Sequence, residues 1–421
     1  ALREQGGNPL PSLIVCPASL VLNWAEECQK FTPELSCVVV DGDAAHRAEL
    51  AESWPAADLV VTSYDLLRRD EALYEGQEFY ACILDEAQAI KNHTTQKYKA
   101  VCKVRSRVRF ALTGTPVENR LGELWSIFSF LMPGYLPPYK SFCSRFEKPI
   151  VQEEDQTAVR RLNQLTGPFI LRRMKSDVLK ELPPKTENVY RIELEEEQRK
   201  LYLAAVVDAR EKLQAAKPED KMAVFAVLMR LREICCDPRL IADNWEGGSA
   251  KLDACVELVS SAVEGGHRIL LFSQFTSMLE LLAKRLDAEG ISHFTLQGST
   301  PKPVRAELVR RFNGGEVSVF LISLRAGGTG LNLTAADIVI HYDPWWNVAA
   351  QNQATDRAYR IGQQNPVQVY KLIAQDTIEE KIVELQQAKQ SLADTVTGTA
   401  DGAILSMRPD ELLQLLEGSE P

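Results

Sequence analysis

Short apolar runs alternate with longer amphipathic segments in two separate parts of the chain. In the N-terminal part such runs occupy residues 13–16, 38–40, 59–61, 82–84 and 110–112. In the C-terminal part they occupy residues 269–272, 294–296, 317–322, 338–342 and 367–373. Runs of this length, separated by helical periodicity, are typical of buried strands in βα units. The pattern therefore predicts an α/β protein with two parallel sheets.

The region between the two sets of strands has a helical pattern. Residues 121–244 show little strand signal and include a long amphipathic stretch at 195–232, and the loop 244–249 is a linker. A further helix, which we expect to brace back across the first set of strands, is predicted from residue 377 to about 392. A flexible tail with a short amphipathic helix at 407–416 follows it. We accordingly divide the chain into a first strand-containing domain, a helical insertion, a second strand-containing domain and a tail. Their boundaries are 1–120, 121–245, 246–375 and 376–421.

Composition narrows the class of protein. A chain of 421 residues is too long for one hydrophobic core. The nine cysteines form no CxxC pair, the five histidines show no metal-ligand spacing, and no apolar run approaches the ~18 residues that a membrane span needs. The net charge of −10 argues against nucleic-acid binding by the chain as a whole. Local basic clusters at 103–109, 160–161, 172–175 and 310–311 could still bind phosphates, although each alone is more often a solvated surface.

An acidic pair follows one of the predicted strands. The apolar run 80–84 leads directly into Asp85 and Glu86. In nucleotide-hydrolysing α/β proteins, an Asp at this position holds magnesium through water, and the adjacent Glu polarises the attacking water. The pair alone is weak evidence, because acidic residues also favour helix starts. The next strand ends in a Thr-Gly-Thr-Pro run, whose Pro116 keeps Thr115 out of helical geometry. We expect Thr113, Gly114 and Thr115 to act as a hydrogen-bonding switch.

A second set of polar residues follows the strand at 338–342. Arg357 and Arg360 lie three residues apart on a predicted helix, with Gln353 one turn earlier on the same face. Planar, permanently charged guanidinium groups suit the outer phosphate of a nucleotide, and an amide can orient the γ-phosphate or a water. The ordinary alternative is a solvated helix face with two incidental arginines. The preceding pair Trp345 and Trp346 and the upstream acidic pair disfavour it.

These motifs, taken in order, resemble the Swi/Snf-type ATPases of helicase superfamily two, from about residue 13 to about residue 392. The resemblance covers motif Ia at 13–17 with Trp24, Ib at 61–64, II at 85–88, III at 112–119, IV at 270–275, V at 323–332 and VI at 353–363. The segment 169–185 resembles the family's linker between lobes. Tyr359 stands where the family more often carries His, and Val348 where Pro is usual; neither position carries charge chemistry.

The resemblance implies two RecA-like lobes, the first incomplete, with ATP and magnesium bound in the cleft between them. Asp85 would hold magnesium through water, Glu86 would polarise the attacking water, and Gly330 and Asn332 would contact the nucleotide. One of the two tryptophans would lie in the core and the other against DNA. The residues that the resemblance assigns to DNA are Pro17, Ser63, Tyr64, Gln274, Arg325, Trp345 and Trp346.

The implied function is ATP-driven translocation on double-stranded DNA that remodels protein–DNA complexes. We expect a monomeric bacterial member acting in the nucleoid, with a nuclear location for a eukaryotic one. RNA polymerase or nucleoid and chromatin proteins are its expected partners on DNA. Two alternatives stay open: an RNA helicase of the same superfamily, and a nucleic-acid docking module that needs no nucleotide. The helical insertion and the Trp-Trp-Asn run at 345–347 favour the translocase.

One family motif is missing. No GxxxxGK[ST] phosphate loop occurs, and the glycine-rich loop 325–330 lacks its lysine. We therefore expect a fragment of a longer protein that binds ATP poorly and hydrolyses it negligibly by itself. The strand that leads into a phosphate loop is expected at the centre of the first sheet, so its loss should leave two unpaired strand edges there.

Overall fold

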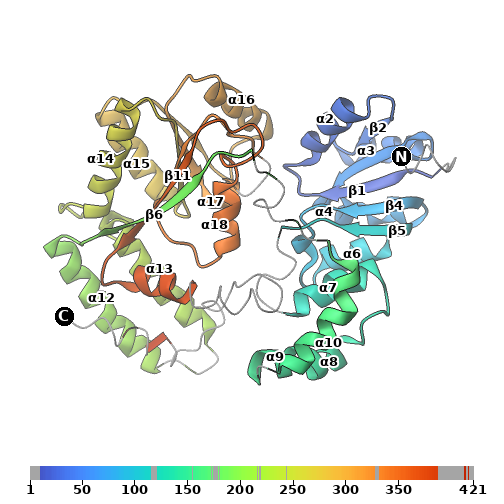
Figure 1. Ribbon diagram of the computed structural model, residues 1–421, viewed down its shortest axis with the longest axis horizontal. Helices are drawn as coiled ribbons and strands as arrows, with labels where there is room; N and C mark the ends of the chain where they lie inside the picture. The colour runs from blue at the N-terminus through green and yellow to red at the C-terminus, as the bar shows by residue number, and fades with distance from the viewer. Residues whose placement is uncertain are drawn as a thin grey trace. The chain divides into compact units, whose positions relative to one another are not determined.

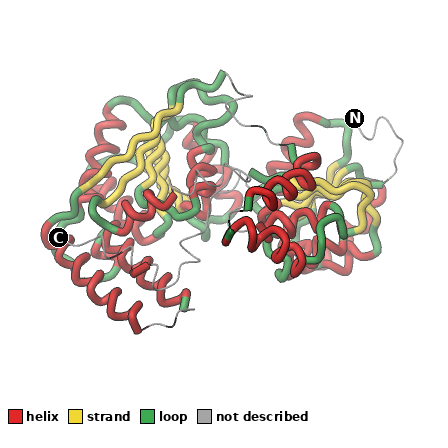
Figure 2. The backbone as a smooth tube through the Cα atoms, turned by 60° about the horizontal axis from the view of Figure 1, so that its bottom comes forward, coloured by secondary structure: helices red, strands yellow, loops and turns green. Residues whose placement is uncertain are grey.

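The computed structural model of the protein divides into two compact units, the first ending at residue 172 and the second beginning at residue 173 (Figure 1). The structure describes residues 10–114 and 121–386, with short gaps at 154, 172, 174–178, 180, 216, 218–219, 243 and 328–330, and also residues 412, 413 and 416. In each unit, helices flank a central sheet (Figure 2). No helix within these described ranges is long and apolar enough to cross a membrane.

The first unit contains a five-stranded, all-parallel sheet in the order β2-β3-β1-β4-β5. Its strands are β1 Ser12–Cys16, β2 Cys37–Val39, β3 Leu59–Ser63, β4 Glu78–Leu84 and β5 Arg105–Ala111. Its longer helices are α2 Val21–Phe31, α3 Ala44–Ser53, α4 Tyr64–Arg69, α5 Glu71–Glu75, α6 Gln96–Lys103, α7 Leu121–Leu131, α8 Tyr139–Phe142, α9 Lys148–Gln152 and α10 Gln156–Thr166. Short helical turns are η1 Trp54–Ala56, η2 Ala87–Ile90, η3 Cys143–Glu147 and η4 Gly167–Phe169.

The core of the first unit packs around a fully buried tryptophan. The Trp54 ring lies 4.7 Å from Tyr74 and 6.3 Å from Phe79, measured between ring centroids. Burial of apolar surface contributes about 25 cal/mol per Å², so large rings of this kind dominate the stability of a core. The cluster ties η1, α5 and β4 together and so fixes the strand that leads to the acidic pair.

The first sheet corrects one expectation from the sequence. We expected a missing strand at its centre, but the five described strands are hydrogen-bonded neighbours without an internal gap. The two edge strands are β2 and β5, and exposed apolar side chains lie at the β5 edge. Val108, Phe110 and Leu112, alternate residues that share one face of the chain, are 36, 44 and 45% exposed there. The exposed apolar surface of this sheet, which we expected at its centre, therefore lies at the β5 edge.

The second unit contains a six-stranded, all-parallel sheet in the order β6-β11-β10-β7-β9-β8. Its strands are β6 Lys185–Ile192, β7 Ile269–Ser273, β8 His293–Leu296, β9 Val319–Ser323, β10 Ile338–His341 and β11 Val367–Ala374. Its helices are α12 Glu196–Ala215, α13 Lys221–Cys236, η5 Pro238–Leu240, α14 Ala250–Glu264, α15 Thr276–Ala288, α16 Lys302–Asn313, α17 Leu324–Gly327 and α18 Val348–Thr355. The predicted fold class, an α/β protein with two parallel sheets, is confirmed.

Strand β6 was missed by the sequence pattern, which indicated a helical region at 121–244. It pairs in parallel with β11 over its whole length, from Lys185 opposite Val367 to Ile192 opposite Ala374. Because β6 is an edge strand, seven of its eight residues are exposed and only Ile192 is buried. A strand with so few buried positions carries no apolar run for the pattern to detect.

A buried histidine lies in the centre of the second sheet. The His341 ring stacks on Phe272 at 5.6 Å between centroids, and its Nε2 lies 2.9 Å from Thr355 Oγ1. Burial lowers the pKa of His341 to about 3, and the nearby Lys371 adds to the effect. The ring is therefore neutral in the folded protein at neutral pH.

We expect His341 to make the second unit acid-sensitive. The pKa of this histidine is lower in the folded state than its ordinary 6.5, so the unfolded chain binds a proton that the folded chain rejects. Stability is then lost as pH falls from 6.5 toward about 3. Relative to the non-titrating control His341→Gln, the wild type should lose roughly 2 kcal/mol more between pH 7 and pH 5. Urea titrations at the two pH values measure this, and parallel losses in both proteins would contradict it.

Candidate functional site

The acidic pair lies at the carboxyl end of β4, in the first unit. Asp85 Oδ2 accepts a hydrogen bond from Trp24 Nε1 on α2 at 2.8 Å, and Oδ1 accepts one from the Glu86 backbone N–H at 2.9 Å. The Asp85 carbonyl accepts from the Tyr64 hydroxyl at 2.9 Å. Burial raises the pKa of Tyr64, and the negative charge of Asp85 raises it further, so this hydroxyl stays a donor. Groups on two helices thus fix the position of Asp85.

Glu86 has a strained backbone. Its φ of 50° and ψ of 54° lie in the left-handed region, which costs a non-glycine residue about 1–3 kcal/mol. Hydrogen bonds on both sides hold this conformation, from Ala87 N to the Leu112 carbonyl and from Ala89 N to the Glu86 carbonyl, each at 2.9 Å. Strain maintained by its surroundings is typical of functional residues.

A hydrogen-bonded relay connects Glu86 to the end of the neighbouring strand. Gln88 Nε2 donates to Glu86 Oε2 at 2.6 Å, and Thr113 Oγ1 donates to Gln88 Oε1 at 2.8 Å. The two motifs expected to be coupled are therefore joined through a residue to which we had given no role. Gly114 follows Thr113 on this loop, and Thr115 lies outside the described residues. The sequence feature that could have identified Gln88 was its place in the Asp-Glu-Ala-Gln run.

Asp85 fits a magnesium ion of the expected kind. Each of its oxygens accepts one hydrogen bond and keeps further lone pairs, and carboxylate oxygen is the ligand that magnesium prefers. Across the described part of the chain, no group of three or more His, Cys, Asp or Glu side chains is arranged to hold a metal. This donor set suits an ion held by one carboxylate together with water and phosphate oxygens.

The arginines lie in the second unit, and their backbone differs from the sequence prediction. Helix α18 carries Gln353 but ends at Thr355, so Arg357 and Arg360 lie in the turns that follow and not on the helix. Continuing the helix would require the Arg357 carbonyl to accept from residue 361. It accepts instead from Leu333 N at 3.0 Å, and this tertiary hydrogen bond replaces the helical one.

The structure nevertheless brings both arginines against the segment that carries Asn332. Arg357 is 8% exposed, and the guanidinium of Arg360 donates through Nη1 to the Leu331 carbonyl at 3.4 Å. Asn332, the next residue, is exposed, and its carbonyl accepts from Asn313 Nδ2 at 2.8 Å. Gln353 is half-buried on α18, and Gly330 lies outside the described residues.

Two residues assigned to DNA in the first unit have side chains engaged within the unit. The Ser63 hydroxyl accepts from Leu66 N at 3.2 Å and caps α4. Tyr64 is 2% exposed and binds the Asp85 carbonyl, so both side chains support the acidic pair in this structure. Pro17 is half-buried at the end of β1, where its carbonyl accepts from Leu20 N.

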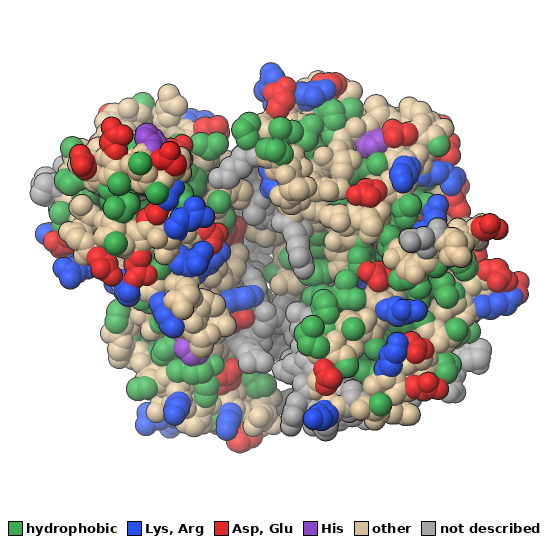
Figure 3. Space-filling model, turned by 180° about the vertical axis from the view of Figure 1, so that it is seen from behind, with side chains coloured by type: hydrophobic (Ala, Val, Ile, Leu, Met, Phe, Trp, Pro, Cys, Tyr) green, Lys and Arg blue, Asp and Glu red, His purple; other side chains and the backbone are tan. Residues whose placement is uncertain are grey.

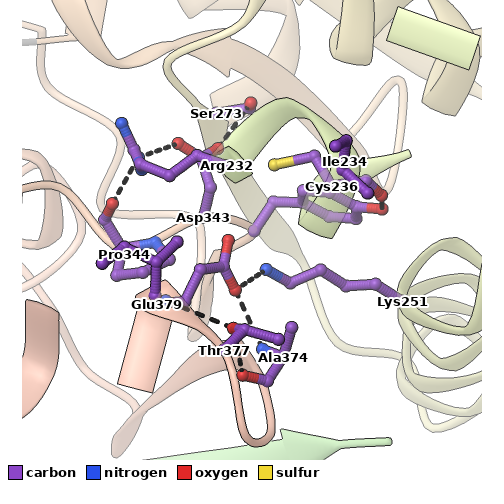
Figure 4. A network of polar contacts seen from close by, with 12 residues as sticks. Arg232, Ile234, Cys236, Lys251, Ser273, Asp343, Pro344, Ala374, Thr377 and Glu379 are labelled. Carbon is purple, nitrogen blue, oxygen red and sulfur yellow. Dashed lines mark hydrogen bonds and ion pairs between the residues drawn. The ribbon is translucent and has the colours of Figure 1, made fainter. Parts of the chain in front are cut away.

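The second unit contains a buried ion pair, Arg232 with Asp343, that the sequence did not reveal (Figure 4). Arg232 on α13 and Asp343 after β10 are completely buried and 3.2 Å apart. Asp343 Oδ1 also accepts from the Ser273 hydroxyl at 2.6 Å and from Gln274 N at 3.2 Å. Burial raises the pKa of Asp343, while Arg232 and Ser273 lower it. The carboxylate thus joins the loop after β7 to the loop after β10.

The two tryptophans extend this cluster. Their rings stack at 4.5 Å, and the Arg232 guanidinium lies over Trp346 at 4.8 Å from its centroid. Trp346 is 5% exposed and lies in the core, whereas Trp345 is half-buried. Both polar atoms of the Gln274 side chain are buried and find no partner among the described residues. Arg325 lies on α17, at the carboxyl end of β9.

A second buried pair anchors the segment after β11. Lys251 on α14 bonds to Glu379, which also accepts from Ala374 N at 2.8 Å (Figure 4). Residues 378–386 are helical, and Ile378 and Ile382 pack on α12 and α13. The described part of this helix belongs to the second unit, and its expected role as a brace across the first set of strands stays a prediction. Within the predicted short helix at 407–416, Leu412 and Leu416 join the same core.

The basic cluster at 103–109 is largely neutralised. Lys103 pairs with Glu71 and Glu75, and Arg107 pairs with Glu78 at 3.4 Å. Arg109 donates to the carbonyls of Phe130 and Val104. Figure 3 shows positive and negative side chains interspersed on the face in view. Lys103, Arg107 and Arg109 therefore bind partners within the protein, as in an ordinary surface of paired charges.

The chain matches two family models in sequence. Residues 2–240 match the SNF2-related domain, and residues 250–362 match the helicase conserved C-terminal domain. An ATP-dependent helicase from Mycoplasma pneumoniae, itself uncharacterized, is 40% identical over 97% of this chain and 39% of its own length. YwqA of Bacillus subtilis, provisionally named an ATP-dependent helicase/translocase, is 39% identical over 98% of this chain and 46% of its own. The chain thus spans less than half the length of these curated relatives.

Similarity extends to a eukaryotic protein and to a solved structure. Human TATA-binding protein-associated factor 172 is 36% identical over 97% of this chain and 26% of its own length. The SWI2/SNF2 ATPase core of Sulfolobus solfataricus in complex with dsDNA is 34% identical, covers 97% of this chain and 87% of that chain, and gives a TM-score of 0.48.

Removing Arg232 should strongly destabilise the second unit. Arg232→Met leaves the Asp343 charge buried without its partner, a change that typically costs about 3–5 kcal/mol. Lys212→Ala is the matched control, because it breaks the exposed pair with Asp208 and should cost about 0.5 kcal/mol or less. Urea unfolding measures both free energies. Equal losses for the two variants would contradict the importance of the buried pair.

Proposed function

The chain belongs to the family of proteins with an SNF2-related domain, and from that membership we propose that it is the motor of an ATP-driven translocase on double-stranded DNA. The observation that carries the proposal is the strained Glu86 beside Asp85, connected through Gln88 to Thr113. A pure scaffold has no physical need for a strained carboxylate held by a relay. A site that must orient water does need one.

In the proposed mechanism, the first unit supplies the water-activating half of the site. Asp85 would hold magnesium, which supplies charge neutralisation at the phosphates. The Gln88 amide holds one oxygen of Glu86, and the other oxygen accepts a hydrogen bond from the attacking water. Any movement of Thr113 is transmitted through Gln88 to Glu86, which couples hydrolysis to the loop after β5.

The second unit would supply the charge-stabilising half. Arg357 and Arg360 neutralise the charge that develops on the γ-phosphate, and Gln353 orients that phosphate or the water. Asn332 and Gly330 complete the nucleotide contacts from the adjacent loop. These roles rest on the family resemblance and on the proximity of segments 331–333 and 357–360.

We propose that DNA is held through its phosphates, without reading of sequence. Pro17, Gln274, Arg325 and Trp345 are the candidate contacts, while Trp346 serves as core. The unsatisfied amide of Gln274 favours a role in binding, because a phosphate oxygen would supply the missing acceptor for its N–H. Protein–DNA complexes are the proposed substrate: the name of the TATA-binding protein-associated factor supports a protein target on DNA, and that of YwqA supports a translocase. The nucleoid or nucleus is the corresponding location.

The full-length protein should hydrolyse ATP faster with duplex DNA than with RNA, whatever the DNA sequence. Its affinity for DNA should fall steeply with salt because phosphate contacts release counterions.

Glu86→Gln is the control: it should bind nucleotide normally and lose turnover, because Asp85 stays while the water-polarising carboxylate is lost. Stimulation by RNA alone would favour the RNA helicase, and an unimpaired Glu86→Gln variant would exclude the proposed site.

Arg360→Ala in the full-length protein should lower kcat by roughly 10³-fold, the scale of an arginine finger. Arg360→Lys should not restore it, because an ammonium cannot reproduce the planar guanidinium. Single-turnover hydrolysis is the measurement, and Arg311→Ala, an exposed arginine paired with Glu316, is the matched control. A fully active lysine variant would refute the assignment.

A further inference from the structure

The turn that carries the two arginines has no regular structure of its own. Helix α18 ends at Thr355, and residues 356–362 form successive turns and bends. A helix would hold Arg357 and Arg360 through its own ladder of hydrogen bonds. Here the positions of both guanidinium groups depend on contacts with other segments.

The side chain of Gln363 makes several hydrogen bonds between this turn and other segments. Its side chain is buried, with 6% of the residue exposed. Nε2 donates toward three carbonyls, those of Ala336 at 2.7 Å, Ala358 at 3.1 Å and Thr334 at 3.2 Å. Oε1 accepts from the backbone N–H groups of Gln364 and Asn365, each at 2.9 Å.

This pattern requires an amide. A glutamine offers two N–H donors and an acceptor oxygen with two lone pairs, and the surroundings of Gln363 use both functions. A carboxylate would present oxygen to three carbonyl oxygens and lose every donor. A hydrocarbon of similar size would leave three carbonyls and two N–H groups to find other partners.

The segments joined by Gln363 are those of the arginine half-site. Ala358 lies between Arg357 and Arg360, and Thr334 and Ala336 follow Asn332 in the adjacent loop. The same loop accepts from Arg360 at Leu331 and donates from Leu333 to the Arg357 carbonyl. The backbone N–H of Gln363 also bonds to the Arg360 carbonyl at 3.0 Å. The Gln363 side-chain amide therefore helps to set the spacing between the arginine turn and the loop behind it, together with the bonds at Leu331 and Leu333.

The turn has a packed side and an open side. Ala358 is buried in an apolar cluster with Leu333 and Ala336, which holds one side of the turn by packing. On the other side, a polar cavity of about 540 Å³ opens beside Gln363, with Arg268, Asn313 and Asp337 in its lining. There the turn is held by the hydrogen bonds of Gln363.

We propose that Gln363 is the positioning residue of the arginine pair: it holds Arg357 and Arg360 at the distance from segment 331–336 that phosphate contact requires. The proposal rests on the proposed function of the two arginines. Gln363 acts through them and contacts no reacting atom itself.

The test is a double-mutant cycle on single-turnover ATP hydrolysis in the full-length protein. Gln363→Glu should slow hydrolysis by at least about 30-fold while the affinities for ATP and duplex DNA stay within about twofold. In an Arg360→Ala background the same change should cost less than about tenfold, because part of the effect of Gln363 acts through that arginine and only the part through Arg357 remains. Gln364→Glu places the same charge on the exposed neighbour and should leave the rate within about twofold.

A pH series separates positioning from loss of structure. A glutamic acid among carbonyl groups has a raised pKa, and its protonated form regains one donor. The deficit of Gln363→Glu relative to wild type should therefore shrink as pH falls from about 8 to about 6. Hydrogen exchange should show faster exchange at the Leu333, Gln364 and Asn365 amides in this variant. If the glutamate variant fails to fold, Gln363→Asn, which keeps the amide but shortens its reach, enters the same cycle.

The outcomes distinguish this inference from the function on which it rests. A normal rate for Arg360→Ala would refute the proposed function. A slow Arg360→Ala combined with a normal rate for Gln363→Glu, or with fully additive losses in the double variant, would refute the positioning role alone.

Discussion

A buried ion pair, Arg232 with Asp343, holds together the carboxyl edge of the second sheet. Arg232 and Asp343 are both removed from water, at a desolvation cost that only good geometry and additional hydrogen bonds offset. Those additional bonds come from Ser273, Gln274 and the Pro344 carbonyl. Because each belongs to a loop at the carboxyl end of a strand, the pair fixes the loops that the proposed function assigns to DNA. Helix α13, which lies outside the sheet, thereby takes part in shaping the binding edge.

The strands could be predicted well where both faces of a strand are buried. Strand β9, for example, is buried at all five positions and appears in the sequence as a continuous apolar run. Strand β6 could not be predicted, because it is held by its pairing with β11 and buries only one residue. The pattern of apolar residues along the chain shows which strands are buried. An exposed edge strand is specified mainly by the strand with which it pairs.

The candidate site shows the same division between local and tertiary information. Asp85 and Glu86 were identifiable because a strand end and an acidic pair are adjacent in sequence. The relay through Gln88 and the cluster around Arg232 were not, because they join residues 25 and 111 positions apart. The helical prediction for Arg357 and Arg360 was wrong for a related reason: a hydrogen bond from Leu333 takes the carbonyl that the helix would have used.

The stacked tryptophans have an optical consequence. Two indole rings with centroids 4.5 Å apart and planes inclined by 29° are close enough for their electronic transitions to couple. Coupled transitions in a chiral setting give paired circular-dichroism bands of opposite sign, which a single indole does not give. The guanidinium of Arg232 lies 4.8 Å from the Trp346 centroid and 5.8 Å from the Trp345 centroid, so its fixed positive charge acts unequally on the two indoles. The loop after β10 therefore contains a native spectroscopic label whose signal depends on the relative orientation of the two rings.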